Sequence, residues 1–226
     1  MTEFFATYFE HVIPLKDEII ESTLQTLYMV TVTGLIAGIL GLFLGVILVA
    51  TDRGGILASP RLYGLLDQVV NLFRSLPFII MLTLVAPLTR LITHTTIGTT
   101  AAIVPLVIGT VPFFARQIQN ALLEVDPGVI EAAESMGSSP LEIIFRVYLK
   151  EGLTAIIRVS SVTIINLIGL TAIVGAIGGG GLGNLAISRG YNRYQNDVTL
   201  VATVIILIIV FISQLIGNAL VKKTSH

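Results

Sequence analysis

Long apolar runs separated by short polar segments dominate the sequence. The first run, residues 24–50, has 27 residues without a charge. A helix needs roughly 20 apolar residues to cross a bilayer. Four further runs lie within about residues 65–88, 97–114, 153–177 and 198–220. This pattern predicts an all-α membrane protein with five transmembrane helices, folded as one transmembrane domain over residues 1–226.

Two of the predicted spans contain residues that are unusual in lipid. Arg74 interrupts the second run, and a charge so deep is costly unless it snorkels, pairs or lines a wet cavity. Pro77 should bend the same helix because it lacks a backbone N–H. In the fourth run Thr163, Asn166 and Gly169 fall within roughly a third of the helix circumference. These five residues are candidates for a translocation path. Snorkelling of Arg74 and helix–helix hydrogen bonds by the other polar side chains are the alternatives.

Glycines mark two places where helix packing should change. Four glycines of the first run recur at spacings of four, three and four: Gly34, Gly38, Gly41 and Gly45. They form one smooth face that suits close helix packing. Four consecutive glycines, residues 178–181, then follow the fourth run. Since no helix survives so much glycine, we expect the fourth span to end there and a pliable loop to begin.

The composition agrees with a membrane protein and excludes several kinds of site. Hydrophobic residues make up 54% of the chain and charged residues 12%, with a mean hydropathy of +0.92, far from a soluble average. The 13 basic and 14 acidic side chains nearly cancel, so no basic face indicates nucleic-acid binding. There is no cysteine, and His11, His94 and His226 are too scattered to predict a metal site.

The amino-terminal segment, residues 1–22, is acidic. It has five acidic residues against a single basic one, Lys16, and apolar residues interleave with these charges. It lacks the basic leader that opens a signal peptide. We therefore expect a short interfacial segment that lies on the membrane surface, with an unstructured tail as the alternative.

A polar segment at residues 126–150 separates the third and fourth runs and predicts two capped helices. Asp126 can cap the first helix, and Gly137 suits the left-handed residue that ends it. Ser139 and Glu142 have the spacing of a capping box, in which each side chain accepts a hydrogen bond from the backbone of the other. The segment is therefore predicted to be a helix, a glycine turn and a second helix.

The first of these helices has one narrow apolar face. The face consists of residues at positions i, i+3, i+4 and i+7: Val129, Ala132, Ala133 and Met136. Because the side chains of the two alanines are short, another surface can approach this face closely. Glu131 and Glu134 flank it. The residues alone leave two interpretations open. The segment is either a well-capped loop on the bilayer surface or a docking element for a partner.

The run EAA from Glu131 to Ala133, followed by Gly137, resembles the EAA motif of ABC-importer permeases. That motif ends in Ile-x-Leu-Pro, whereas this chain has VYLK at residues 147–150 and so lacks the proline. The resemblance implies a type I ABC importer permease fold, with this segment as the cytoplasmic coupling helix in a groove of the ATPase subunit. It assigns ATPase coupling to six residues: Glu131, Ala132, Ala133, Met136, Gly137 and Leu149.

Three further stretches resemble the permease of methionine importers. They are FRSLPFII at residues 73–80, VPFFAR at residues 111–116 and GGGGLGNLAISRGY, which ends at Tyr191. This resemblance implies uptake of methionine, L- and in some members D-, by alternating access through a dimeric five-span permease bound to two ATPase subunits. A lipid-anchored or periplasmic binding protein would deliver the substrate. The chain would be a transport subunit and not an enzyme, without a cofactor of its own, because ATP and magnesium bind to the partner ATPase.

Basic residues indicate the orientation in the membrane. If the loop after the first span, residues 126–150 and the C-terminal tail share one side, that side has seven lysines and arginines against four on the other. The positive-inside rule then places residues 126–150 and the C-terminus in the cytoplasm and the N-terminus outside. An ATPase subunit could meet the segment only there. We expect a multi-pass protein in the cytoplasmic membrane of a prokaryote.

Rival functions fit the sequence less well. A secondary transporter usually has more spans, repeated halves and acidic residues at the midplane. Here the acidic residues avoid the spans, with Asp67 only at a boundary. An intramembrane protease needs a nucleophile and a base, and no span contains a histidine. Five spans are too few to enclose a solute path, so we expect a homodimer. No GxxxxGK[ST] motif is present to bind ATP. The remaining alternative is an ABC importer permease for another amino acid or small polar solute.

Overall fold

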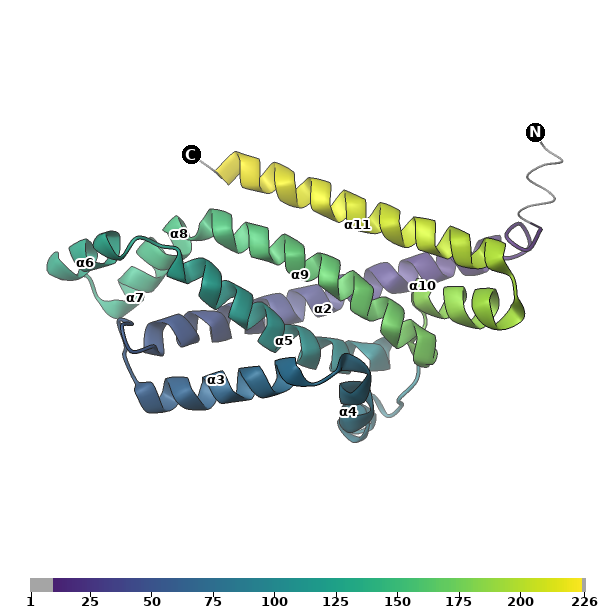
Figure 1. Cartoon of the computed structure of the whole chain (residues 1–226), viewed down its shortest axis with the longest axis horizontal. Coiled ribbons are helices and arrows are strands. Elements are labelled where there is room, and N and C mark those ends of the chain that lie inside the picture. Colours follow the sequence, from purple (N-terminus) through teal and green to yellow (C-terminus); the bar gives the residue numbers. More distant parts are fainter. Residues whose placement is uncertain (1–9, 225–226) are drawn as a thin grey trace. The chain divides into compact units, whose positions relative to one another are not determined.

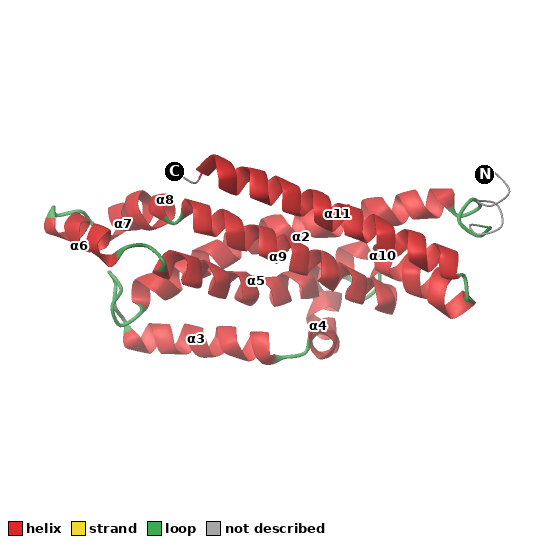
Figure 2. Cartoon of the chain, turned by 45° about the horizontal axis from the view of Figure 1, so that its top comes forward, coloured by secondary structure: helices red, strands yellow, loops and turns green. Residues whose placement is uncertain are grey.

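The structure is a computed structural model that describes residues 10–224, and helices dominate this part of the chain (Figure 1). Within it no strand occurs, and short loops join the helices (Figure 2). Four helices in this range are long and apolar enough to cross a membrane: α2 (Lys16–Thr51), α5 (Thr99–Leu123), α9 (Leu153–Val174) with the turn after it, and α11 (Asn196–Thr224). α3 (Pro60–Ser75) and α4 (Phe78–Thr93) make a fifth span when the broken pair is counted as one. The predicted all-α membrane fold is confirmed, with its second span in two pieces.

The second span breaks at Leu76 and Pro77, between α3 and α4. Leu76 (φ −75°, ψ 128°) and Pro77 (φ −56°, ψ 129°) are both extended. Proline cannot donate the next helical hydrogen bond, and its ring disfavours the helical conformation in the residue before it. The sequence predicted a bend at this proline, and the structure goes further, with two separate helices.

Two spans extend beyond their apolar runs. α5 continues to Leu123, so Arg116 lies inside this helix, whereas the predicted third span ended at residue 114. α2 begins at Lys16, and its first turn contains acidic residues, which favour the positive end of the helix dipole. Residues 16–22 are therefore the first turns of α2 and not a separate interfacial segment. Residues 10–15 form turns, and the rest of that predicted segment lies outside the described residues.

The fourth span ends at the four-glycine stretch as predicted, because Ile177 and Gly178 have non-helical dihedral angles, but the pliable loop expected after it is replaced by short helical turns. After α9 come a π-helical turn (Gly175–Gly179), the short helix α10 (Gly181–Asn184), a second π-helical turn (Leu185–Gly190) and a 3₁₀ turn (Tyr191–Arg193). Gln25 Oε1 on α2 accepts a hydrogen bond from the Gly181 N–H at 2.8 Å. Thr26 Oγ1 accepts one from the Leu182 N–H at 2.9 Å. These acceptors satisfy N–H groups that the start of a helix leaves free, so the chain returns to helix despite its glycines.

Contacts divide the chain into two compact units, each made of discontinuous segments. Unit 1 comprises Met1–Gly34, Pro77–Val107 and Ile164–Ser213, and unit 2 comprises Leu35–Leu76, Ile108–Thr163 and Gln214–His226. Among the described residues of unit 1, buried apolar clusters form around Met29, Leu106 and Leu167, and around Leu182, Leu185 and Val198. The single domain predicted for residues 1–226 stays a prediction.

Close packing of α2 against α5 builds the core of unit 2. A Cβ atom at Gly45 would lie 2.6 Å from the Ile118 side chain, and one at Gly41 would lie 2.8 Å from Phe114. Only glycine permits so close an approach of the two helices. For the other two glycines of the predicted face, Gly34 and Gly38, no described atom lies closer than 3.9 Å to such a Cβ. The predicted close-packing face is thus confirmed at two of its four glycines.

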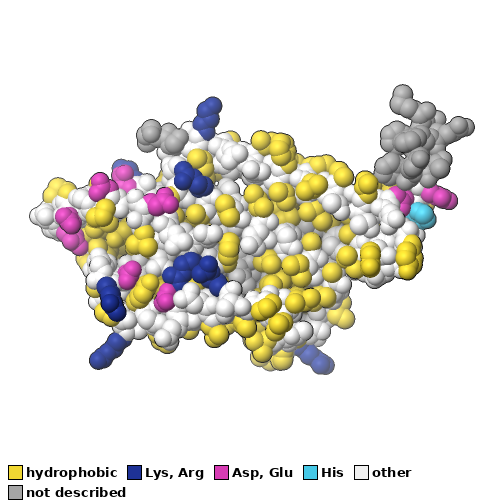
Figure 3. Space-filling view, in the orientation of Figure 1, with side chains coloured by type: hydrophobic (Ala, Val, Ile, Leu, Met, Phe, Trp, Pro, Cys, Tyr) yellow, Lys and Arg dark blue, Asp and Glu magenta, His cyan; other side chains and the backbone are white. Residues whose placement is uncertain are grey.

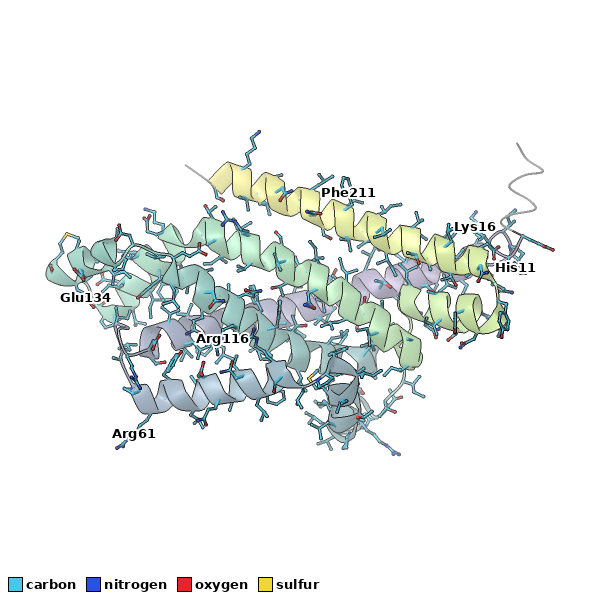
Figure 4. The ribbon with its side chains drawn as sticks, viewed as in Figure 1. His11, Lys16, Arg61, Arg116, Glu134 and Phe211 are labelled. Atoms are coloured by element: carbon cyan, nitrogen blue, oxygen red, sulfur yellow. The ribbon has the colours of Figure 1, made fainter. Side chains whose placement is uncertain are left out.

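The long helices leave apolar side chains exposed. On the part of α11 in unit 1, Leu207 and Phe211 are 60% and 61% exposed, and Figure 4 labels Phe211 on this helix. Apolar side chains are visible on the surface of both units in Figure 3. Apolar surface on this scale indicates contact with lipid or with another subunit.

Candidate functional site

The segment at residues 126–150 consists of short helices that lie together in unit 2 (Figures 1 and 2). They are α6 (Pro127–Ser135), α7 (Pro140–Ile143), a π-helical turn (Ile144–Tyr148) and α8 (Leu149–Glu151). The π-helical turn interrupts the second predicted helix. Its wider spacing lets Ile143, Ile144 and Tyr148 all reach the buried interior. Lys150, where the EAA motif has proline, keeps its N–H and lies inside α8.

The caps of this segment form as the sequence predicted. The Asp126 side chain accepts a hydrogen bond from the Gly128 N–H at 2.8 Å and begins α6. Gly137 has φ +80°, the left-handed conformation in which only glycine is unstrained. At the start of α7 the Ser139 N–H donates to Glu142 Oε2 at 3.0 Å, and the Glu142 N–H donates to Ser139 Oγ at 3.4 Å. The capping box is therefore confirmed, and both helices of the segment have fixed starting points.

Charge and burial shift two titrating groups of the segment. Hydrogen bonds from the Ser139 backbone and hydroxyl lower the pKa of the Glu142 carboxyl, and Arg146 at 4.0 Å acts in the same direction. A lowered pKa means that this carboxylate stabilises the fold above its unfolded pKa, and that the contribution is lost as the pH falls through the folded pKa. The capping box thus persists at neutral pH. Burial raises the pKa of the Tyr148 hydroxyl, helped by the negative charge of Glu134.

The predicted apolar face of α6 is divided between the interior and the surface. Ala133 is 6% exposed and lies in a buried cluster with Ile118 and Leu122 of α5. Ala132 and Met136 of the same predicted face are exposed. The reason is that Ile130, three residues before Ala133, packs against the same cluster, so one side of the helix turns inward. Ala133 therefore anchors α6, and a partner would meet the opposite side.

Four large apolar side chains of the segment remain exposed. They are Val129 (42%), Met136 (79%), Leu141 (64%) and Phe145 (66%), and we refer to them as the outward surface. Glu131 and Glu134 of α6 are also exposed, and Figure 4 labels Glu134 on this helix. Acidic and apolar side chains share this end of unit 2 in Figure 3. Exposed apolar side chains among charged ones on a rigid, capped segment are typical of a protein-binding site.

Two other predicted coupling residues, Gly137 and Leu149, contribute to the shape of the segment. At Gly137 a Cβ atom would meet nothing within 4 Å, so this glycine is needed for its backbone conformation and not for space. Leu149 is half-buried and begins α8. Both residues shape the segment, whereas the outward surface supplies the large exposed side chains.

The five candidate path residues do not share one environment. Arg74 lies exposed in the last turn of α3, where its charge suits the negative end of the helix, and it has no ion pair with any described residue. Pro77 is at the break before α4. Thr163 is buried, and its hydroxyl donates to the Val159 carbonyl at 2.8 Å. Asn166 and Gly169 are exposed. Their role in a path stays a prediction.

The structure also brings together polar residues that the sequence did not connect. Arg116 of α5, which Figure 4 labels, forms an ion pair with Asp67 of α3, 49 residues earlier. Asn71 and Gln119 accept further hydrogen bonds from the same guanidinium. In the sequence, Asp67 and Arg116 are visible only as two opposite charges beside apolar runs. Their separation of 49 residues does not indicate that they pair.

Comparison with known proteins identifies the family. Residues 39–226 match the family described as "Binding-protein-dependent transport system inner membrane component". The chain belongs to this family. A permease of Vibrio cholerae named "Probable D-methionine transport system permease protein MetI" is 46% identical over 211 residues, which cover 93% of this chain and 94% of the relative. The Bacillus subtilis "Methionine import system permease protein MetP" is 47% identical over 212 residues, 93% of this chain and 96% of the relative.

A solved structure agrees with this membership. The chain superimposes on a subunit of the inward-facing "MetNI methionine ABC transporter" with a TM-score of 0.92 and 39% sequence identity, covering 94% of this chain and 99% of that one. The chain therefore has the type I ABC permease fold and is a multi-pass inner-membrane component of a transport system. As a member of this family it is a transport subunit and not an enzyme.

Proposed function

We propose that this chain is the permease subunit of an ATP-driven importer that carries methionine across the cytoplasmic membrane. The observation that carries the proposal is the capped segment at residues 126–150, which has the EAA run and a rigid outward surface. The choice of methionine is supported by the names of relatives that are 46% and 47% identical to this chain over most of its length.

The packing of unit 2 gives this segment a mechanical role. Ala133, Ile143 and Tyr148 share one buried cluster with Ile118 and Leu122 of α5. Close-packed interiors transmit displacement because they cannot deform without opening voids. When two ATPase subunits close on ATP, they would push the segment, and the C-terminal half of α5 would move with it. The solute path would then alternate between outward-facing and inward-facing states.

The assembly around the chain follows from what the chain lacks. It has no nucleotide-binding motif, so ATP and magnesium belong to two ATPase subunits that contact the outward surface. Its few spans require a second copy of the chain to enclose a path. The family description includes a binding protein, which we place on the outer face as the source of substrate. The distribution of basic residues supports a cytoplasmic C-terminus and an N-terminus outside.

Two of the candidate path residues have the stronger claim to contact substrate. Asn166 and Gly169 are exposed on α9, so a second copy or a solute can reach them. The Thr163 hydroxyl is already used inside its own helix, and the exposed Arg74 guanidinium suits the end of α3. We therefore assign the path to the Asn166 and Gly169 side of α9 in unit 1.

Uptake by reconstituted vesicles tests the proposed function. Vesicles containing the permease and its ATPase, loaded with ATP and given the binding protein outside, should accumulate labelled L-methionine. Unlabelled methionine should compete, while histidine and glutamine should not. Competition by another amino acid without competition by methionine would support an importer for a different solute. Proton-driven uptake in the absence of ATP would contradict the ABC assignment.

A further inference from the structure

A polar network in unit 2 ties α3 to α5. It consists of Tyr63, Asp67 and Asn71 on α3 and Arg116 and Gln119 on α5, and we refer to it as the Asp67–Arg116 network. The Arg116 guanidinium forms the ion pair with Asp67 and donates to Asn71 Oδ1 at 3.1 Å and to Gln119 Oε1 at 2.6 Å. Two bonds complete it, from Asn71 Nδ2 to Asp67 Oδ2 at 3.0 Å and from Gln119 Nε2 to the Tyr63 hydroxyl at 3.4 Å. Every residue of the network therefore has a partner, and among the described atoms only the buried Arg116 Nε–H of this network is left without an acceptor.

The charged pair and Gln119 are largely withdrawn from the surface, whereas Tyr63 is half-buried and Asn71 is exposed. The side chains of Arg116 and Asp67 are 15% and 27% exposed, and Gln119 is buried. An apolar cluster that includes Val70 of α3 and Ala115 of α5 lies beside it along the same helices. A buried ion pair can often be replaced by well-packed apolar residues without loss of stability. Apolar side chains alone could therefore hold α3 and α5 together. The charged network needs another explanation, which we find in the relative register of the two helices.

Directional hydrogen bonds specify register, which apolar contacts do not. The planar guanidinium of Arg116 donates from Nη1 to Gln119 and from Nη2 to Asp67 and Asn71, so three acceptors fix its position, whereas a lysine would act as a point charge. Burial of apolar surface is non-directional and so favours no particular angle between two groups. The network therefore holds α3 in one register on α5.

The position of the network on α5 connects it to the coupling segment. Arg116 and Gln119 face α3, while Ile118 and Leu122 of the same helix turns pack in the cluster that contains Ala133. α5 is thus bonded on one side to α3 and packed on another against α6. A displacement of the segment that moves α5 reaches α3 through the network.

We propose that Arg116 is a positioning residue that locks α3 to α5, so that α3 follows the coupling segment during the transport cycle. This inference rests on the proposed function, since it needs an ATPase that pushes the segment. The network shares no residue with the outward surface. Its loss should therefore weaken the link between hydrolysis and transport and leave ATPase binding in place.

The test is the amount of methionine transported per ATP hydrolysed in reconstituted vesicles. Asp67→Asn and Arg116→Lys should lower this ratio by about tenfold, within the usual range of coupling between sites in proteins, while the assembled complex forms at the wild-type level. The double variant Asp67→Leu with Arg116→Met removes both charges, so it should fold and assemble and yet remain uncoupled. The exchanged pair, Asp67→Arg with Arg116→Asp, should raise the amount of methionine transported per ATP part of the way back to the wild-type value.

An ion pair of unit 1 provides the matched control. Arg189 Nε and Glu18 Oε1 are 2.8 Å apart, and their side chains are 34% and 33% exposed. Arg189→Gln should leave the ratio unchanged. A wild-type ratio in the assembled double variant would overturn the inference, as would lower assembly or thermal stability with the ratio intact. Absence of methionine uptake by the wild-type complex would instead contradict the proposed function.

Discussion

Glutamate at both Met136 and Phe145 should abolish ATP-driven uptake by preventing the ATPase subunits from binding. Both side chains are mostly exposed, at 79% and 66%, so the substitutions should not disturb the core of unit 2. Central apolar anchors of an interface are often worth about 2 kcal/mol or more each, which corresponds to roughly 30-fold weaker binding per substitution. Co-purification of the ATPase with the permease, and titration of one against the other in detergent, measure this loss.

Leu57→Glu is the matched control for this prediction. Leu57 is 49% exposed and follows α2 in a loop outside the segment, on the side that we assign to the cytoplasm. Its substitution adds one glutamate, of the two that the double variant adds, at an exposed apolar position without touching the outward surface, so ATPase binding should remain at the wild-type level. Wild-type binding by the Met136→Glu, Phe145→Glu variant would contradict the assignment of the outward surface.

Leucine at Gly45 should destabilise the permease itself. Even a Cβ atom there would lie 2.6 Å from the Ile118 side chain and 2.7 Å from the Ala115 carbonyl oxygen, and a backbone atom cannot swing aside. Overpacking of a filled interior costs about 1–3 kcal/mol, and the larger value is expected because two helices must separate. Thermal unfolding in detergent should therefore begin at a clearly lower temperature, and the yield of assembled complex should fall.

Gly38→Leu separates this packing effect from a general intolerance of leucine in α2. Gly38 is seven residues earlier on the same helix, and no described atom lies within 4 Å of a Cβ built there. The substitution should leave the unfolding temperature near that of the wild type. Equal destabilisation by both substitutions would show that close packing at Gly45 is not the cause.

Local patterns in the sequence predicted what depends on neighbouring residues. The caps at Asp126 and Ser139 and the left-handed Gly137 each involve bonds or dihedrals within a few residues, and all three are present. Pro77 acts through its own ring on the residue before it, so the break in the second span was also readable. The apolar runs placed the spans, although helix ends moved where polar residues could continue a helix.

Features that depend on contacts between residues far apart in the chain could not be predicted from the sequence. The helix α10 begins at the last of the four glycines because Gln25 and Thr26, 156 residues away, accept its first hydrogen bonds. The pairing of Asp67 with Arg116 spans 49 residues and needs α3 beside α5. The inward turn of Ala133 likewise follows from packing on α5, which helical spacing alone does not determine.

A single thiol at position 136 tests the central claim most directly. The chain has no cysteine, so Met136→Cys introduces one reactive group, at a side chain that is 79% exposed on the coupling segment. A membrane-impermeant thiol reagent should modify it only from the cytoplasmic side, and a short cross-linker should join it to the ATPase subunit. Modification from the outer side, or cross-linking only to proteins other than an ATPase, would contradict a permease driven through this segment.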